Sequence, residues 1–263
     1  MPAADARTQF QRVAVGDARV DLRTYRRYDD AGTPAWPGSG SEVVLVHGIG
    51  ASERYFGPLI WELARTATVH TLELPGFGTA PKPERQLQME DFGRIAVQAL
   101  EAAGIRGAQW VGHSMGCQVV VEMALAAPDA VSSVVLLGPT INDAERSAPL
   151  QALRLLQDCL GEPPAVNAIL VTDYLFRAGP RWYLKTLPVM IRHRMEERIR
   201  GVQPPVLLVR GGKDPVVRAD WLARLAAARP GTRTAEVPGQ PHVMMYNRPV
   251  ETAALLHSAV PSR

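Results

Sequence analysis

The sequence predicts an α/β fold with a mostly parallel sheet, because short apolar runs alternate with helical patterns along most of the chain. The run Val43–Val46 is β-branched and too short for a helix, which favours a buried strand. Residues 89–103 carry apolar side chains at helical spacing and stop before Gly104, as a helix would. Such alternation places helices on both faces of the sheet.

The other elements follow the same alternation. An antiparallel strand pair is expected at 13–15 and 20–25, ahead of the strand at 43–46. The later elements are a helix at 56–65, a strand at 68–72, a helix at 89–103, a strand at 108–111, a helix to about 127, a strand at 131–137, a strand at 206–210, a helix at 221–228, a strand at 233–237 and a helix at 250–260.

The alternation stops for about 60 residues after Gly138-Pro139. This stretch predicts helices at 148–160, 165–176, 182–187 and 190–200, with no strand between them. We therefore expect a core formed by residues 1–139 and 204–263, with a helical cap, or lid, inserted at 140–203.

Composition narrows the classes of protein. The chain has 263 residues, 46% hydrophobic and 21% charged, which suits one α/β domain with an insertion. A net charge of +3 without a dense Lys/Arg tract argues against nucleic acid as a partner. No apolar run reaches the roughly 18 residues of a membrane span, and Met1–Phe10 lacks the apolar core of a secretory signal.

Cys117 and Cys159 cannot form a disulfide framework, so we expect a cytoplasmic protein. No cysteine or histidine cluster has zinc spacing, and neither a metal nor a cofactor is predicted.

The segment Gly112-His113-Ser114-Met115-Gly116 lies between a predicted strand and a predicted helix. A G-x-S-x-G in this position is typical of a nucleophile elbow, a tight and strained turn that exposes the serine. Glycines on both sides are needed because a side chain there would collide with the neighbouring strand or helix. We therefore predict Ser114 as the nucleophile, with the Met115 N–H directed at whatever bonds to it.

A serine hydroxyl needs a base within reach and an acid that orients the base. His242 follows the last strand in an irregular loop rich in glycine and proline, which can deliver its imidazole to Ser114. Asp214 lies in the turn directly after the strand at 206–210 and is predicted as the acid, with Asp143 in reserve. The chain order Ser114, Asp214, His242 is the one expected when a serine elbow follows a strand of such a sheet.

The stretch His47-Gly48-Ile49-Gly50 follows the strand at 43–46. Its glycines allow the backbone to approach a substrate closely, and the Ile49 N–H would join that of Met115 in an oxyanion hole. His47 is expected to be structural, beneath this loop. The side chain of His113 is expected to point away from the serine oxygen. The remaining histidines are interpreted as surface or core residues: His70, His193 and His257.

With these pieces assembled, the chain resembles the α/β-hydrolase superfamily, in particular serine esterase and lactonase members with a helical cap. The matching stretches are His47–Gly50, Leu72–Gly78, Gly112–Gly116, Gly211–Val217 and Pro241-His242. The resemblance implies an eight-stranded mostly parallel sheet, a triad of Ser114, Asp214 and His242, and an oxyanion hole from Ile49 and Met115. The chain departs from the family pattern at Glu73, Pro241 and Cys117, and none of these changes removes a catalytic group.

These residues predict a cofactor-independent serine hydrolase that cleaves a small or medium carboxylic ester or lactone through an acyl-enzyme on Ser114. Serine at position 114 disfavours relatives with an aspartate nucleophile. Carbon–carbon bond hydrolases rank lower, because they usually carry asparagine where His113 stands. Acyl transfer or cyclisation in specialised metabolism, and a small-molecule receptor that retains the triad, stay open as alternatives.

A small-molecule substrate is the expected partner, and the sequence leaves the oligomeric state open. We expect Trp182, Met190, Val243 and Met244 to contact the substrate, although many apolar side chains of the cap simply pack it on the core. Basic residues between 177 and 200 would attract an anionic substrate, but a solvated helix face is the preferred interpretation.

Overall fold

The computed structural model describes residues 6–27 and 41–259. Within them, a single sheet has the strand order β1-β2-β4-β3-β5-β6-β7-β8. The strands are β1 (Ala6–Val15), β2 (Ala18–Arg27), β3 (Ser41–Val46), β4 (Ala67–Glu73), β5 (Ala108–His113), β6 (Val131–Leu137), β7 (Val206–Gly211) and β8 (Arg233–Val237). β2 pairs antiparallel with both β1 and β4, and the pairs from β4 to β8 are all parallel. The predicted eight-stranded, mostly parallel sheet is confirmed.

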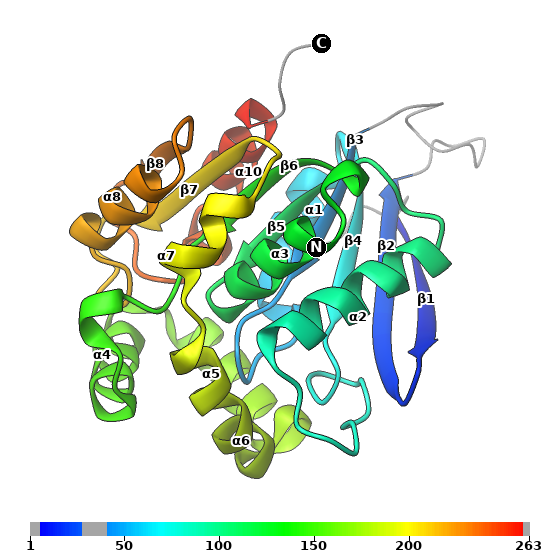
Figure 1. Cartoon of the computed structure of the whole chain (residues 1–263), viewed down its shortest axis with the longest axis horizontal. Helices are drawn as coiled ribbons and strands as arrows, with labels where there is room; N and C mark the ends of the chain where they lie inside the picture. Colours follow the sequence, from blue (N-terminus) through cyan, green and yellow to red (C-terminus); the bar gives the residue numbers. More distant parts are fainter. Residues whose placement is uncertain (1–5, 28–40, 260–263) are drawn as a thin grey trace.

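Helices cover both faces of this sheet (Figure 1). Helices α2 (Met89–Ala102), α3 (Met115–Ala126) and α8 (Ala219–Ala228) pack into one apolar cluster. Helices α1 (Gly57–Leu63) and α10 (Pro249–Ser258), with the short α9 (Met244–Asn247), pack into another. The strands separate the two clusters because successive side chains point to opposite faces. In β3, Val44 and Val46 enter the first cluster, whereas Val43 and Leu45 enter the second.

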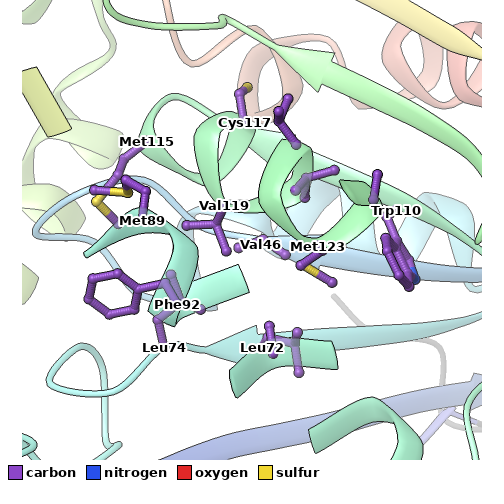
Figure 2. Packing of buried hydrophobic residues seen from close by; sticks show 14 of the residues in the cluster. Val46, Leu72, Leu74, Met89, Phe92, Trp110, Met115, Cys117, Val119 and Met123 are labelled. Atoms are coloured by element: carbon purple, nitrogen blue, oxygen red, sulfur yellow. The ribbon is translucent and has the colours of Figure 1, made fainter. Parts of the chain in front are cut away.

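Helix α3 is buried on almost every side, since it lies between the sheet and α2. Figure 2 shows Val119 and Met123 of α3 packed near Val46 of β3 and Phe92 of α2. This packing fixes the helix that begins directly after Ser114, and with it the position of the serine itself.

The segment between β6 and β7 is helical, as predicted. We call residues 140–203 the insertion. It contains α4 (Ala148–Gly161), α5 (Pro164–Thr172), a π-helical turn η4 (Asp173–Ala178), α6 (Pro180–Arg192) and α7 (Met195–Arg198), besides short 3₁₀ turns at Asp143–Glu145 and Ile199–Gly201. Helices α4, α5 and α6 lie together at one end of the sheet (Figure 1).

The prediction of separate helices at 182–187 and 190–200 was wrong. Helix α6 continues through Pro188 to Arg192, and α7 follows as a separate turn. Pro188 is exposed, while Trp182, Val189 and Met190 are buried on the other side of α6. Burial of that apolar face therefore holds the helix together across the proline, which sequence spacing alone treats as a break.

Among the described residues, no helix combines the length and apolar character needed to cross a bilayer. Cys117 and Cys159 are both free thiols, the first of them fully buried.

Candidate active site

Ser114 occupies a strained turn between β5 and α3. Its φ of 56° and ψ of −121° make it the one non-glycine residue with positive φ in the described part of the chain. A Cβ on Gly112 would lie 2.4 Å from the Gly116 carbonyl oxygen, and one on Gly116 would lie 2.2 Å from that of Val46. Both flanking positions therefore require glycine, as expected for an elbow that brings strand and helix this close.

His242 and Asp214 form a buried pair. His242 Nδ1 donates to Asp214 Oδ2 at 2.7 Å, and both residues are at most 4% exposed. The other carboxylate oxygen of Asp214 accepts the backbone N–H groups of Val216 and Val217 at 2.7 and 2.9 Å. The carboxylate is thus held by the turn after β7, and it places the hydrogen on Nδ1 of the neutral imidazole. His242 Nε2 is buried and has no hydrogen-bond partner among the described residues.

The end of β6 brings Ser114 and His242 to the same rim of the sheet. The Ser114 backbone N–H donates to the Leu137 carbonyl oxygen at 3.0 Å. The next residue, Gly138, lies against the His242 ring, because a Cβ there would be 2.7 Å from His242 Cε1. The ring centroids of His113 and His242 are 4.7 Å apart. The imidazole therefore lies beside the elbow, and its Nε2 makes no hydrogen bond to Ser114 Oγ.

Asp143, the reserve acid, lies elsewhere. Its carboxylate forms an ion pair with Arg224 at 2.8 Å and is a third exposed. The acid in contact with His242 Nδ1 is Asp214.

The loop after β3 lies directly against Ser114. A Cβ on Gly48 would be 3.0 Å from Ser114 Cβ and 3.5 Å from Ser114 Oγ. Ile49 follows in this loop, while Met115 is the first residue of α3. His47 holds the loop from below: its Nδ1 donates to the Gly48 carbonyl oxygen at 2.8 Å, and its Nε2 accepts the Leu74 N–H at 3.1 Å. Both nitrogens are used in structure, as the sequence suggested for this histidine.

A buried chain of hydrogen bonds joins this loop to residues 238–243, which carry His242 and which we call the histidine loop. The Gly48 N–H donates to Tyr55 Oη at 2.9 Å, and the tyrosine hydroxyl lies 2.9 Å from His113 Nδ1. His113 Nε2 lies 3.1 Å from the His242 carbonyl oxygen. Because a carbonyl only accepts, Nε2 carries the hydrogen and Nδ1 accepts from the Tyr55 hydroxyl. Burial, and then the neighbouring His242, hold the pKa of His113 well below its ordinary value, so this ring is neutral.

Sequence reasoning missed Tyr55 and three carboxylates of the insertion. Asp173 accepts the N–H of Ser52 at 3.0 Å and its hydroxyl at 2.6 Å, which anchors the end of the loop after β3. Asp158 and Glu162 accept backbone N–H groups of the histidine loop. Sequence alone favours a solvated position for an acid such as Asp158 in a predicted helix, and Glu162 directly follows the end of α4, so neither residue indicates a distant partner.

The electrostatic surroundings of His242 favour its charged form. Burial lowers the pKa of this histidine, but the negative charge of Asp214, its hydrogen bond, and the charges of Asp158 and Glu162 outweigh burial and raise the pKa to about 9. Burial also raises the pKa of Asp158, and it raises that of Glu162 to about 7.

The four residues expected to contact a substrate are all buried. Trp182 packs against Gly76 in the turn after β4, since a Cβ on Gly76 would be 2.3 Å from its indole nitrogen. Met190 lies in α6, and its carbonyl accepts the Gln118 side chain at 2.9 Å. Val243 and Met244 directly follow His242.

Two departures from the family pattern have structural roles. Glu73 Oε2 accepts the Thr79 N–H at 2.8 Å, so it supports the turn at 75–78, as expected. Cys117 is fully buried, and its thiol lies 3.2 Å from the carbonyl oxygens of Gly112 and Leu137.

Comparisons with known proteins identify the family to which the chain belongs. The model of the alpha/beta hydrolase family matches residues 43–255. A pimeloyl-[acyl-carrier protein] methyl ester esterase of Methylococcus capsulatus is 29% identical over 265 residues, with 86% of this chain and 96% of the esterase covered. The esterase of the same description from Aliivibrio salmonicida is 35% identical over 98 residues, but the chain spans only 36% of its length. The solved structure of Est816, described as an N-acyl homoserine lactone degrading enzyme, superposes with a TM-score of 0.78 at 19% identity, covering 94% of this chain and 99% of Est816. The match along the greater part of the sequence, together with the sheet and its serine elbow, shows that the chain belongs to the α/β-hydrolase family.

Proposed function

We propose that this chain is a cofactor-independent serine hydrolase that cleaves a small or medium carboxylic ester or lactone, with Ser114, His242 and Asp214 as catalytic residues. The observation that carries the proposal is the Asp214–His242 pair, whose free Nε2 lies at the rim where Ser114 occupies a strained elbow. That arrangement suits a hydroxyl activated by a base, itself oriented by an acid.

The chemistry follows from these roles. Ser114 Oγ attacks the carbonyl carbon of the substrate while His242 Nε2 accepts its proton, and Asp214 stabilises the imidazolium that forms. The backbone N–H groups of Ile49 and Met115 donate to the oxyanion, each contributing about 2.7–4 kcal/mol to the transition state. His242 then protonates the departing alkoxide and leaves an acyl group on Ser114. Water repeats the sequence and releases the acid.

Both esterases compared above are described as acting on a methyl ester, which supports an ester substrate. In our proposal the insertion is a cap, and the substrate contacts Trp182 and Met190 from the insertion and Val243 and Met244 beside His242. The partner is a small molecule, with no metal, cofactor, nucleic acid or membrane involved. Two free thiols and no disulfide among the described residues suit a reducing compartment such as the cytoplasm.

The test combines a covalent probe with hydrolysis of short p-nitrophenyl esters. A fluorophosphonate is expected to add once to the wild-type chain, at Ser114 by peptide mass mapping. Ser114→Ala is expected to abolish labelling and to lower kcat by about 10⁴–10⁶-fold. Ser147→Ala, at an exposed position ahead of α4, is the matched control. It should keep both the labelling and the wild-type kcat.

Near-full turnover by Ser114→Ala would refute the assignment. Hydrolysis in ¹⁸O-labelled water should place the label in the acid product. Product without the label would indicate acyl transfer or cyclisation instead, and tight ligand retention with negligible turnover would indicate a receptor.

A further inference from the structure

Asp158 in helix α4 and Glu162 directly after the helix turn their carboxylates toward the loop that carries His242. Asp158 Oδ1 accepts the backbone N–H of His242 at 2.8 Å. Four residues later, Glu162 Oε1 accepts the backbone N–H of Val243 at 2.6 Å, and its Oε2 accepts from Asn247 Nδ2 at 3.2 Å. Asp158 is 2% exposed and Glu162 is 6% exposed. Two acids of the insertion thus bond consecutive amides of the core.

The polarity of α4 is the reverse of an ordinary surface helix. Asp158 faces inward, as does Glu162 directly after the helix, whereas Leu153, Leu156 and Leu160 are 47%, 61% and 85% exposed. Burying a carboxylate is unfavourable unless hydrogen bonds compensate it. Here the compensating bonds come from the backbone N–H groups of His242 and Val243 and from the Asn247 side chain in α9.

The backbone and ring of His242 are held at three points. Asp158 accepts its N–H, His113 donates to its carbonyl oxygen, and Asp214 accepts from Nδ1. The free rotation that remains for this residue is small, and Nε2 keeps its direction. One of the three contacts, the bond from the His242 N–H to Asp158, comes from the insertion, whereas the other two come from the core.

We propose that Asp158 and Glu162 are positioning residues that hold His242 in its catalytic orientation, so that the insertion helps to complete the catalytic base. This inference rests on the proposed hydrolase function, because it takes His242 as the base.

In this geometry the carboxylates of Asp158 and Glu162 also add negative charge near the His242 imidazole. The groups that face it are Asp214 from the turn after β7, Asp158 and Glu162 from the insertion, and neutral His113 from β5. Asp158 and Glu162 each raise the pKa of His242. Asp158→Asn keeps an oxygen acceptor and removes the charge, whereas Asp158→Ala removes both. The two variants therefore separate placement from electrostatics.

The experiment uses the full chain and compares Asp158→Ala, Asp158→Asn and Glu162→Gln with the wild type. Gln157→Ala is the matched control, since Gln157 is exposed on α4 and bonds only Arg154 among the described residues. Hydrogen exchange of the His242 amide should accelerate in Asp158→Ala and stay slow in Gln157→Ala. In Asp158→Ala, kcat for a p-nitrophenyl ester should fall by roughly 100-fold with little change in KM, because a displaced base costs about this much.

Asp158→Asn is expected to rescue kcat and to move the acid limb of the kcat/KM profile to lower pH. NMR titration of the His242 ring should show the same lower pKa in Asp158→Asn and in Glu162→Gln. An unchanged ring pKa in both variants, or unchanged His242 exchange in Asp158→Ala, would overturn the inference. If Asp158→Ala fails to fold, the NMR titration of the His242 ring in Asp158→Asn and Glu162→Gln still tests the inference.

The exchange and titration readouts need no turnover. A wild-type chain that lacks esterase activity and fluorophosphonate labelling would refute the proposed function, and unchanged amide and ring behaviour would refute the positioning role. The two failures are therefore distinguishable.

Discussion

His113 donates from Nε2 to the carbonyl oxygen of His242 at 3.1 Å, so the residue that precedes the proposed nucleophile holds the residue proposed as its base. Through Nδ1 the same ring accepts from Tyr55, whose hydroxyl oxygen accepts from Gly48. One buried chain of bonds thereby connects the loop after β3, the elbow and the histidine loop. A ring in this position must stay neutral, and its depressed pKa is consistent with that need.

Tyr55→Phe removes the central link of this chain. The Gly48 N–H and His113 Nδ1 lose their partner in the interior, where an unsatisfied polar group costs about 1–3 kcal/mol. We expect the free energy of unfolding, measured by urea titration, to fall by this amount, and kcat to fall with it. Tyr246→Phe is the control, because the Tyr246 side chain is only partly buried and its hydroxyl forms no hydrogen bond within the described part of the chain. Equal stability of the two variants would contradict the role given to Tyr55.

Asp214→Asn and Asp143→Asn distinguish the two acids considered from the sequence. Asp214 contacts His242 Nδ1, and an amide there disturbs the tautomer of the imidazole. We expect kcat to fall by about 10⁴-fold. Asp143→Asn weakens a half-exposed ion pair with Arg224 and should leave kcat within a few fold of wild type. A larger loss in Asp143→Asn than in Asp214→Asn would reverse the assignment of the acid.

The pKa of His242, raised to about 9, predicts the pH dependence of the reaction. The imidazole must be neutral to accept the Ser114 proton, and below its pKa it is protonated. The value of kcat/KM should therefore rise with pH and reach half its plateau near pH 9. The measurement is a kcat/KM profile with a substrate that does not ionise in this range, corrected for spontaneous hydrolysis. A plateau that is complete by pH 6 would rule out this titration of the base.

Gly48→Ala tests the close approach of the loop after β3 to the nucleophile. The added Cβ would lie 3.0 Å from Ser114 Cβ, so either the loop or the serine must shift. We expect kcat to drop by roughly 100-fold, since a displacement of this kind spoils the reacting geometry. Gly57→Ala meets no atom within 4 Å at the start of α1 and should retain full activity. Full activity in Gly48→Ala would show that this contact is unimportant.

The fold could be predicted from local sequence patterns, because most helices and strands bury one face and the spacing of their apolar residues shows it. The opening strands β1 and β2 are longer than the apolar runs at 13–15 and 20–25 suggest, since antiparallel pairing around Gly16 continues through polar residues. Helix α6 passes Pro188 for a comparable reason: contacts with the core outweigh a local break.

Ser114, Asp214 and His242 could be chosen from sequence because turn residues mark the ends of strands, and parallel strands bring those ends to one edge. Their chain order and glycine neighbours are local information. The sequence by itself thus determined the fold class, the elbow and the candidate acid and base. The tertiary structure alone decided that Tyr55, Asp158 and Glu162 surround the site. Each is far along the chain from its partner and lies in or directly after a helical segment whose own pattern does not indicate that partner.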